Sequence, residues 1–242
     1  MWLFTKKYFL RDLLTGAVDI HNHILPCIDD GAPTLETSLE MLQLFKELGF
    51  KECIATPHIM ADYYGNTATS IQETYNTTNA ALAGSPFEGY ITSAASEYML
   101  DDGFETLLNK NELLFLKDRI LLTELSYFQK PNNLLELCYQ MVTSNIHPIL
   151  AHPERYGYFK SIADFKDLKQ RGFLLQLNIL SLSGHYGDAA RKMGEQLLLA
   201  NMVDYIATDA HRPEHLEKMK DLTIPKKLIT PLELICEGQR LF

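Results

Sequence analysis

The sequence lacks the features that are typical of membrane-spanning, disulfide-rich and nucleic-acid-binding proteins. No apolar run approaches the ~18 uninterrupted residues of a transmembrane helix, so no transmembrane segment is predicted. The four cysteines are widely scattered and include no C-x-x-C pair, which argues against a disulfide framework and favours the reducing cytoplasm. A formal charge of −9 argues against a surface that holds nucleic acid or an anionic membrane.

The first residues also lack the marks of an export signal. Residues 1–16 have no apolar core of roughly 7 to 15 residues, because charged residues from Lys6 to Asp12 interrupt them. We expect an N-terminal arm that packs on the protein as a helix or an extended segment, with an amphipathic anchor at a membrane surface as the alternative. Because internal repeats and low-complexity linkers are absent, residues 17–242 are expected to form a single domain of a size common among α/β barrels.

Short apolar runs alternate along the chain with longer segments of helical character. Seven runs are strand candidates, at residues 17–23, 52–58, 90–97, 120–126, 148–152, 173–178 and 203–209. Between the first two runs, Leu35, Leu39, Leu42 and Phe45 recur at helical spacing, and further helix candidates lie between the later runs. Strands that alternate with helices indicate βαβ units and a parallel sheet.

Ionisable residues lie at the ends of six of the seven predicted strands. The residues that share this position are His21, His23, His58, Glu97, Glu124, His152, Asp209 and His211. In parallel α/β barrels the carboxyl ends of the strands form the active-site face. Each residue alone is more often a solvated strand end or a hydrogen-bonded histidine, but several carboxylates around one mouth are costly to bury without cations. The joint pattern therefore predicts a metal site.

These motifs resemble a known protein family over nearly the whole chain. Between about residues 18 and 220, the segments VDIHNHILPCIDDG, ATPHI, SEYML, LTEL, AHPERY and ATDAHRP follow in order. They resemble the PHP (polymerase and histidinol phosphatase) superfamily, and within it the bacterial manganese-dependent protein tyrosine phosphatases of capsule and exopolysaccharide loci. The resemblance implies an α/β fold, a distorted seven-stranded (β/α) barrel similar to a TIM barrel, with the metal site at the carboxyl ends of the strands.

The resemblance also implies three divalent metal ions, with manganese expected and iron or zinc as alternatives. Imidazole and carboxylate ligands suit these metals better than ions that prefer thiolates. Carried over to this sequence, the three ligand sets are His21, His23, Glu97 and Asp209; Glu97, Glu124 and His152; and Asp30, His58 and His211. Glu97 would bridge two ions, and Asp19 and Asp29 are candidates for supporting the ligands.

The implied reaction is hydrolysis of phosphotyrosine by a metal-activated hydroxide. By resemblance, Arg155 would grip phosphate oxygens through two parallel hydrogen bonds. Arg212 lies in a shorter loop than in the relatives, and either replaces their second arginine or forms a surface ion pair. His58, His211 or a metal-bound water would protonate the leaving tyrosinate. The implied partner is a phosphotyrosine protein, such as the tyrosine-rich tail of a membrane tyrosine kinase of polysaccharide synthesis or export.

Other classes of protein fit the sequence less well. A cysteine-based tyrosine phosphatase is excluded, because no arginine lies six positions after any cysteine. A PHP phosphoesterase that acts on a small molecule such as histidinol phosphate is the nearest alternative. Amidohydrolase-like barrels also begin with His-x-His, but the placement of Glu97, Glu124 and His152 fits the PHP pattern better. A non-catalytic PHP interaction module would show eroded ligands, and none is visible.

Overall fold

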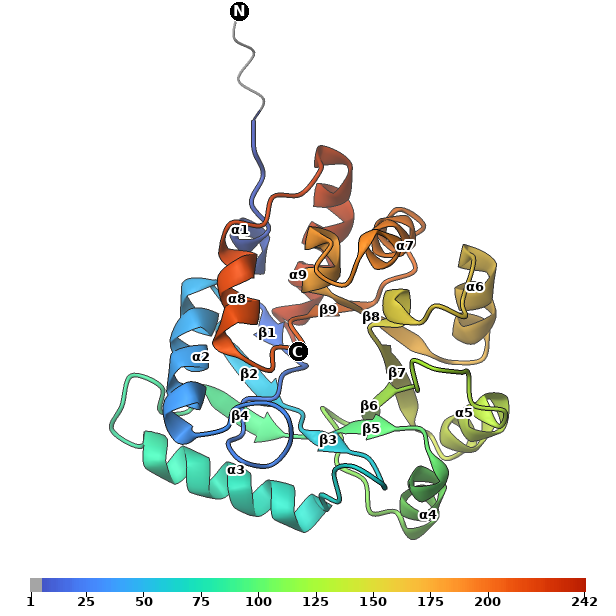
Figure 1. Ribbon diagram of the computed structural model, residues 1–242, viewed down its shortest axis with the longest axis horizontal. Coiled ribbons are helices and arrows are strands. Elements are labelled where there is room, and N and C mark those ends of the chain that lie inside the picture. Colours follow the sequence, from blue (N-terminus) through green and yellow to red (C-terminus); the bar gives the residue numbers. More distant parts are fainter. Residues whose placement is uncertain (1–5) are drawn as a thin grey trace, which may run out of the picture.

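The computed structural model describes residues 6–242, whose strands lie in the middle of the molecule with helices around them (Figure 1). One sheet has three strands in the order β1 (Val18–Asp19), β2 (Glu52–Ala55) and β4 (Ile91–Ala94). The other sheet has six strands in the order β3 (His58–Ile59), β5 (Glu97–Met99), β6 (Ile120–Glu124), β7 (His147–Ala151), β8 (Leu174–Asn178) and β9 (Tyr205–Ala207). Every neighbouring pair is parallel, which confirms the predicted parallel α/β organisation.

The strands differ in number and continuity from the expected seven-stranded barrel. Two predicted runs are each broken into two strands, β2 with β3 and β4 with β5. Pro57 follows β2 and has no backbone N–H to donate to a sheet. Beside it, the hydroxyl of Thr56 replaces regular pairing by accepting from the backbone N–H of Asn22 (3.0 Å) and donating to its carbonyl (3.1 Å). The strands of residues 6–242 therefore form two sheets, and no single closed sheet is seen among them.

Backbone hydrogen bonds nevertheless join the two sheets where the strands end. The N–H of Glu97 donates to the carbonyl of Pro57 (3.1 Å), between the second and third predicted runs. At the other side, Asn22 and Ala210 form an isolated parallel bridge, and the N–H of His23 donates to the carbonyl of Ala210 (3.0 Å). These bonds hold the carboxyl ends of the first and last runs side by side.

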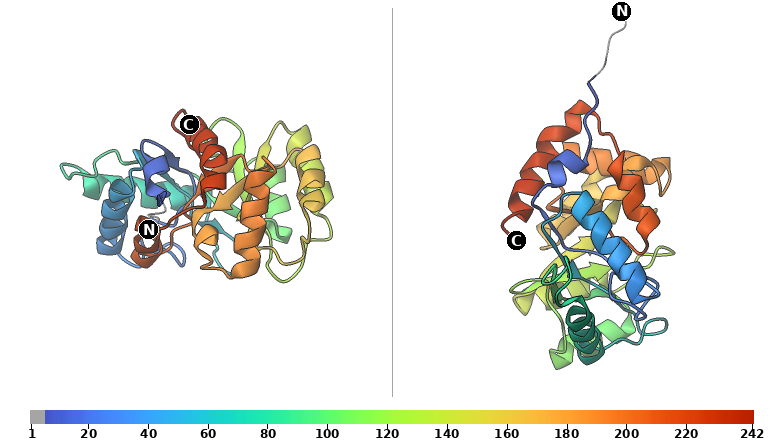
Figure 2. Two further views of the ribbon diagram at one scale, coloured as in Figure 1. Left: turned by 90° about the horizontal axis from the view of Figure 1, so that it is seen from above. Right: turned by 90° about the vertical axis from the view of Figure 1, so that its left-hand side faces the viewer.

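The helices lie on the outside of the strands, as the views in Figure 2 also show. They are α1 (Arg11–Leu14), α2 (Leu35–Glu47), α3 (Ala68–Leu82), α4 (Asp102–Lys110), α5 (Leu134–Thr143), α6 (Ile162–Gln170), α7 (Asp188–Leu199), α8 (Pro213–Lys220) and α9 (Ile229–Gln239), with short 3-10 helices η1 (Pro153–Arg155), η2 (Ile179–Ser183) and η3 (Lys226–Leu228). The predicted helix after the first strand is confirmed by α2, which buries Leu42 and Phe45. Thr34 caps it, since its hydroxyl accepts from the N–H of Thr37.

Part of the predicted N-terminal arm packs on the C-terminal region. Residues 1–5 lie outside the described residues, whereas Leu10 and Leu14 are fully buried in the main core. The N–H of Leu10 donates to the carbonyl of Leu222 (2.9 Å), and α1 packs against α9. Because both leucines are in the core, they are not available to a lipid surface. Within residues 6–242, no helix combines the length and apolar character needed to cross a bilayer.

A small apolar cluster ties the two sheets together. It is distinct from the larger core under the helices, and its buried members are Val18, Ile20, Ile54, Ala95, Leu116, Leu122, Ile149, Ala151 and Ala207. Short aliphatic side chains from β1, β2, β6, β7 and β9 thus pack against one another between the strands. This packing fixes the strands relative to one another, so the polar residues at their carboxyl ends are held in place.

Candidate metal centre

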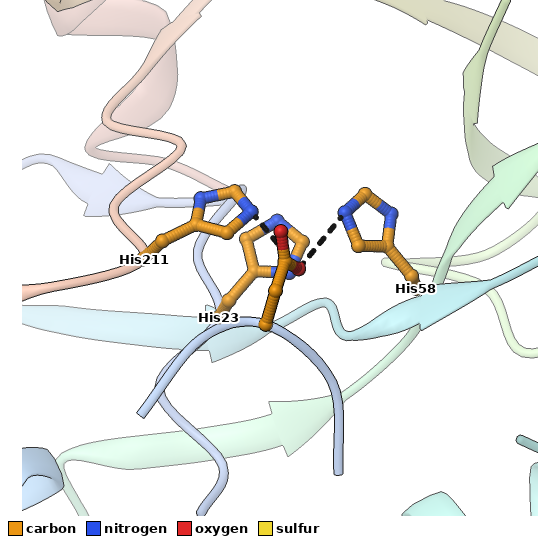
Figure 3. A group of neighbouring side chains, drawn as sticks. His23, His58 and His211 are labelled. Atoms are coloured by element: carbon orange, nitrogen blue, oxygen red, sulfur yellow. Dashed lines mark ion pairs between the residues drawn. The ribbon is translucent and has the colours of Figure 1, made fainter. Parts of the chain in front are cut away.

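The nine predicted ligands converge on one region of the fold. Seven are buried, Asp30 and His211 are more accessible, and the set is His21, His23, Asp30, His58, Glu97, Glu124, His152, Asp209 and His211. Eight of them fall into three overlapping groups whose ligand atoms lie within 4.8 Å of one another. Figure 3 shows the imidazoles of His23, His58 and His211 turned toward one another.

The first group contains His21, His23, Glu97 and Asp209. The Nε2 atom of His21 lies 3.0 Å from Oε2 of Glu97 and 3.4 Å from Oδ1 of Asp209. The Nε2 atom of His23 lies 3.4 Å from each of the same two oxygens. The structure therefore brings together the four residues that the resemblance assigned to one ion.

The second group contains His58, Glu97 and Glu124, which differs from the expected set. The Nδ1 atom of His58 lies 2.9 Å from Oε1 of Glu124 and 3.3 Å from Oε2 of Glu97. His152, which was expected here, instead lies with its Nε2 atom 3.0 Å from Oε1, the other oxygen of Glu97. Glu97 thus faces histidines through both of its oxygens.

The third group contains Asp30, His58 and His211, as expected, and also His23. The Oδ1 atom of Asp30 lies 3.5 Å from Nε2 of His58 and 3.4 Å from Nε2 of His211. The side chain of Asp30 is half exposed, so this group forms the accessible side of the cluster. His23 and His58 therefore link the third group to the other two.

Five buried polar atoms at the centre of the cluster fit cation binding. Within residues 6–242 none of them makes a regular hydrogen bond, although they face one another at 2.9 to 3.4 Å, and they are His21 Nε2, His23 Nε2, His58 Nδ1, Glu97 Oε2 and Glu124 Oε1. Buried polar atoms without partners are rare in folded proteins because they lose hydration without compensation. Imidazole nitrogens and carboxylate oxygens are the donors that Mn²⁺, Fe²⁺ and Zn²⁺ accept. The donor set therefore fits divalent cations.

The charges of the cluster depend on one another. Burial alone lowers the pKa of His21, but the carboxylates of Glu97 and Asp209 raise it to about 9. Burial and the charge of Glu97 raise the pKa of Glu124 to about 7. Histidines that carry protons in this way compensate the buried carboxylates, a role that cations take over when they bind. We therefore expect cation binding to release protons.

Two histidines of the cluster are oriented by side chains that contact their Nδ1 atoms. The Nδ1 atom of His21 lies 2.8 Å from Oε1 of Gln176, and the Nδ1 atom of His23 lies 2.7 Å from Oδ2 of Asp29. Each contact directs Nε2 of the same ring toward the cluster. Asp29 also accepts from the backbone N–H of His58 (3.0 Å) and of Gly31 (2.9 Å). Asp29 therefore holds the His23 ring and the backbone of His58 in place.

The sequence did not single out β8, the one predicted strand without an ionisable residue at its end. Its buried amides Gln176 and Asn178 nevertheless support the cluster. Gln176 contacts His21, and the Nδ2 group of Asn178 donates to Oδ2 of Asp209 (2.9 Å). Two amides at alternate positions of an apolar strand were the available signal, because alternate residues of a strand share one face.

The two predicted arginines occupy different positions at this site. The Nη1 group of Arg155 donates to Oδ2 of Asp209 (2.7 Å), and the side chain is largely buried. Arg212 is exposed at the start of α8, where it lines a groove of about 550 Å³ together with Asp30 and His211. Arg155 therefore contacts a predicted ligand directly, whereas Arg212 borders the accessible third group.

A substitution of Gly31 tests how the loop that carries Asp29 and Asp30 packs against His23. A Cβ atom at this position would lie 2.1 Å from the carbonyl oxygen and 2.4 Å from the Cβ atom of His23. We expect Gly31→Ala to displace the loop that carries Asp29 and Asp30, and to lower both thermal stability and Mn²⁺ affinity. Gly238→Ala is the matched control, because a Cβ atom there meets nothing within 4 Å. Unchanged Mn²⁺ affinity of Gly31→Ala in calorimetry would show that the loop tolerates the shift.

Comparison with known proteins places the chain among relatives of similar length. The family described as "Capsular polysaccharide synthesis, CpsB/CapC" matches residues 17–224. Tyrosine-protein phosphatase YwqE of Bacillus subtilis is 29% identical over 238 residues, which cover 93% of each chain. Putative tyrosine-protein phosphatase CapC of Staphylococcus aureus is 29% identical over 197 residues, which cover 80% of this chain and 76% of CapC.

A solved structure agrees with this relationship. It comes from work on YwqE of Bacillus subtilis and CpsB of Streptococcus pneumoniae, described as "unique metal-dependent tyrosine phosphatases". It superimposes with a TM-score of 0.77 at 25% identity and covers 93% of this chain and 92% of the matched chain. The likeness therefore extends over the strands and loops that carry the cluster.

Proposed function

Because the chain belongs to the CpsB/CapC family of capsular polysaccharide synthesis, we propose that it is a metal-dependent protein-tyrosine phosphatase, a phosphoric monoester hydrolase. The observation that carries this proposal is the buried cluster of histidines and carboxylates whose central atoms face one another and make no regular hydrogen bond within the described residues. The full-length likeness to a metal-dependent tyrosine phosphatase supports the same reaction.

We propose that three divalent cations, manganese in the first place and iron or zinc otherwise, bind at the three groups. His21, His23, Glu97 and Asp209 would hold one ion, and Glu97 and Glu124 a second with His58 or His152. Asp30, His58 and His211 would hold the third, next to His23. Four carboxylates and three divalent ions leave the site at roughly +2, so it attracts phosphate although the protein is acidic. When bound, such ions supply hydroxide as a nucleophile at neutral pH.

The residues of the chain would bind the substrate and move a proton. Arg155 lies beside Asp209 and would bind phosphate oxygens through its remaining N–H groups, which stabilises charge that develops in the transition state. Arg212 lines the groove beside Asp30 and would contact the substrate from the accessible side. His58 or His211 would donate a proton to the leaving tyrosinate oxygen. Tyrosinate is a comparatively good leaving group, so a weak acid suffices.

We further propose that the two sheets represent one distorted (β/α) barrel formed by residues 17–242, with residues 1–16 as an arm. The backbone hydrogen bonds from His23 to Ala210 and from Asp209 to His21 support this, since they connect the first and last runs as in a closed barrel. The physiological substrate would be a phosphotyrosine protein in the cytoplasm, such as the tyrosine-rich tail of a membrane tyrosine kinase. The four free cysteines are compatible with a reducing compartment.

Phosphate release from a phosphotyrosine peptide tests the proposed function. We expect the purified protein to release phosphate when Mn²⁺ is present and to stop when a chelator removes the metal. Histidinol phosphate, offered at the same concentration, is expected to be hydrolysed far more slowly. The opposite preference would overturn the assignment in favour of a small-molecule phosphoesterase, and hydrolysis of neither substrate would favour a non-catalytic module.

A further inference from the structure

Two tyrosine rings contact the guanidinium of Arg155. Its central carbon lies 4.9 Å from the ring centroid of Tyr127 and 4.0 Å from that of Tyr186. Both distances are within the ~6 Å over which a cation is attracted to an aromatic face. Tyr127 follows β6, Arg155 is in η1 and Tyr186 lies between η2 and α7, so three separate segments of the chain meet here.

This packing leaves most hydrogen-bond donors of Arg155 unused. Within residues 6–242, the guanidinium makes a single hydrogen bond, from Nη1 to Oδ2 of Asp209. Arginine carries N–H donors along the edge of a planar group. Aromatic rings that pack against a guanidinium fix its orientation and leave its N–H donors free to bind an oxyanion. A second carboxylate partner would fix the orientation equally well but would occupy those donors.

Tyr127 also contacts one of the predicted ligands. Its hydroxyl lies 3.2 Å from Nδ1 of His152, and the two rings stack with their centroids 5.7 Å apart. The Nε2 atom of His152 faces Oε1 of Glu97 at 3.0 Å. When Nδ1–H donates to the tyrosine oxygen, the lone pair of Nε2 is directed into the cluster, which is the state that a metal ligand needs.

The exposure of Tyr127 argues against a purely structural role. The residue is 42% exposed and the following Phe128 is 99% exposed, so this segment lies at the surface. Tyr156 provides the contrast, because it is fully buried and its hydroxyl accepts from the backbone N–H of Leu125 (2.9 Å). Tyr127 is not a member of either buried apolar cluster.

We propose that Tyr127 is a positioning residue with two separable parts. Its hydroxyl orients His152 toward the cations, and its ring, together with the ring of Tyr186, orients Arg155 toward the phosphate. This proposal rests on the proposed function, in which cations bind at the cluster and Arg155 binds phosphate. Neither tyrosine belongs to the pattern of histidines and carboxylates at the strand ends, so that pattern does not mark them.

Three substitutions separate the hydroxyl from the ring. We measure Mn²⁺ affinity by calorimetry, and then the affinity of the Mn²⁺-saturated protein for inorganic phosphate. Tyr127→Phe is expected to weaken Mn²⁺ binding about 10-fold and to leave phosphate binding unchanged. Tyr186→Leu is expected to leave Mn²⁺ binding unchanged and to weaken phosphate binding about 2- to 30-fold. Tyr127→Leu should show both losses, and the ring restored in Tyr127→Phe should rescue phosphate binding.

Tyr139→Leu is the control, since this tyrosine is 66% exposed on α5, outside the cluster. The proposal is overturned if Tyr127→Phe binds Mn²⁺ as tightly as the wild type, or if both leucine variants at Tyr127 and Tyr186 bind phosphate normally. It is also overturned if the wild type binds no Mn²⁺. If these binding differences appear but the wild type releases no phosphate from a phosphotyrosine peptide, the proposed reaction fails while the positioning role stands.

Discussion

Glu97→Gln is expected to abolish phosphotyrosine hydrolysis and to release about two of the three proposed cations. Glu97 is fully buried at the amino end of β5, and its two oxygens face histidines on different sides. Oε2 lies 3.0 Å from His21 and Oε1 lies 3.0 Å from His152. An amide of the same size keeps the packing but removes the charge and one of the two acceptor oxygens. Both cations that share Glu97 would therefore lose a ligand.

The expected loss of activity is large. Metal ions stabilise developing charge by several kcal/mol, and each ~1.4 kcal/mol is tenfold in rate, so we expect a decrease of at least about a thousandfold. Elemental analysis of the purified protein measures the metal content, and peptide dephosphorylation measures the rate. Glu73→Gln is the matched control, because Glu73 is an exposed residue of α3. A Glu97→Gln protein that keeps its metals and its rate would rule out the bridging role.

The sequence predicted which residues lie together because the fold itself brings them together. Parallel strands point the same way, so residues at the carboxyl ends of successive predicted runs become neighbours even when they are far apart in the chain. His21 and Asp209 illustrate this, since they are 188 positions apart in number yet 3.4 Å apart in space. Ionisable side chains at such positions could therefore be recognised without knowing any distance.

The grouping of the ligands was less predictable, because it depends on local backbone geometry. The break at Pro57 makes His58 the first residue of β3, where it pairs in register with Glu97, so its ring enters the second group. His152 has a left-handed backbone conformation (φ 36°), which turns its side chain toward the far oxygen of Glu97. Strand breaks and positive φ values at residues other than glycine leave little trace in a sequence.

The contacts of the neutral side chains Gln176 and Asn178 with the cluster were not predicted, for a different reason. Gln176 and Asn178 carry no charge and do not change protonation state, so a search for ionisable residues at strand ends passes over β8. Their role follows from burial, since an amide at 0% exposure must find partners, and here the partners are His21 and Asp209. Polar residues at alternate positions of an otherwise apolar strand are therefore informative even when they are neutral.

Arg155→Ala is expected to lower kcat/KM for a phosphotyrosine peptide about 100- to 1,000-fold while the metals remain bound. The magnitude is that of removing one donor aimed at developing charge in a water-excluded site. Removal of the guanidinium also takes a positive charge away from Asp209, its partner at 2.7 Å. Since Asp209 belongs to the first group, its affinity for a cation should be unchanged or higher.

A second substitution separates charge from shape at this position. Arg155→Lys keeps the positive charge but loses the planar guanidinium and its packing on the Tyr186 ring. We therefore expect this variant to be more active than Arg155→Ala and less active than the wild type. Arg171→Ala is the control, because Arg171 is an exposed arginine in an ion pair with Asp167. The measurements are peptide dephosphorylation and metal content on the same preparations. If Arg155→Ala loses activity and metal together, the arginine holds Asp209 in the cluster and is not the group that binds phosphate.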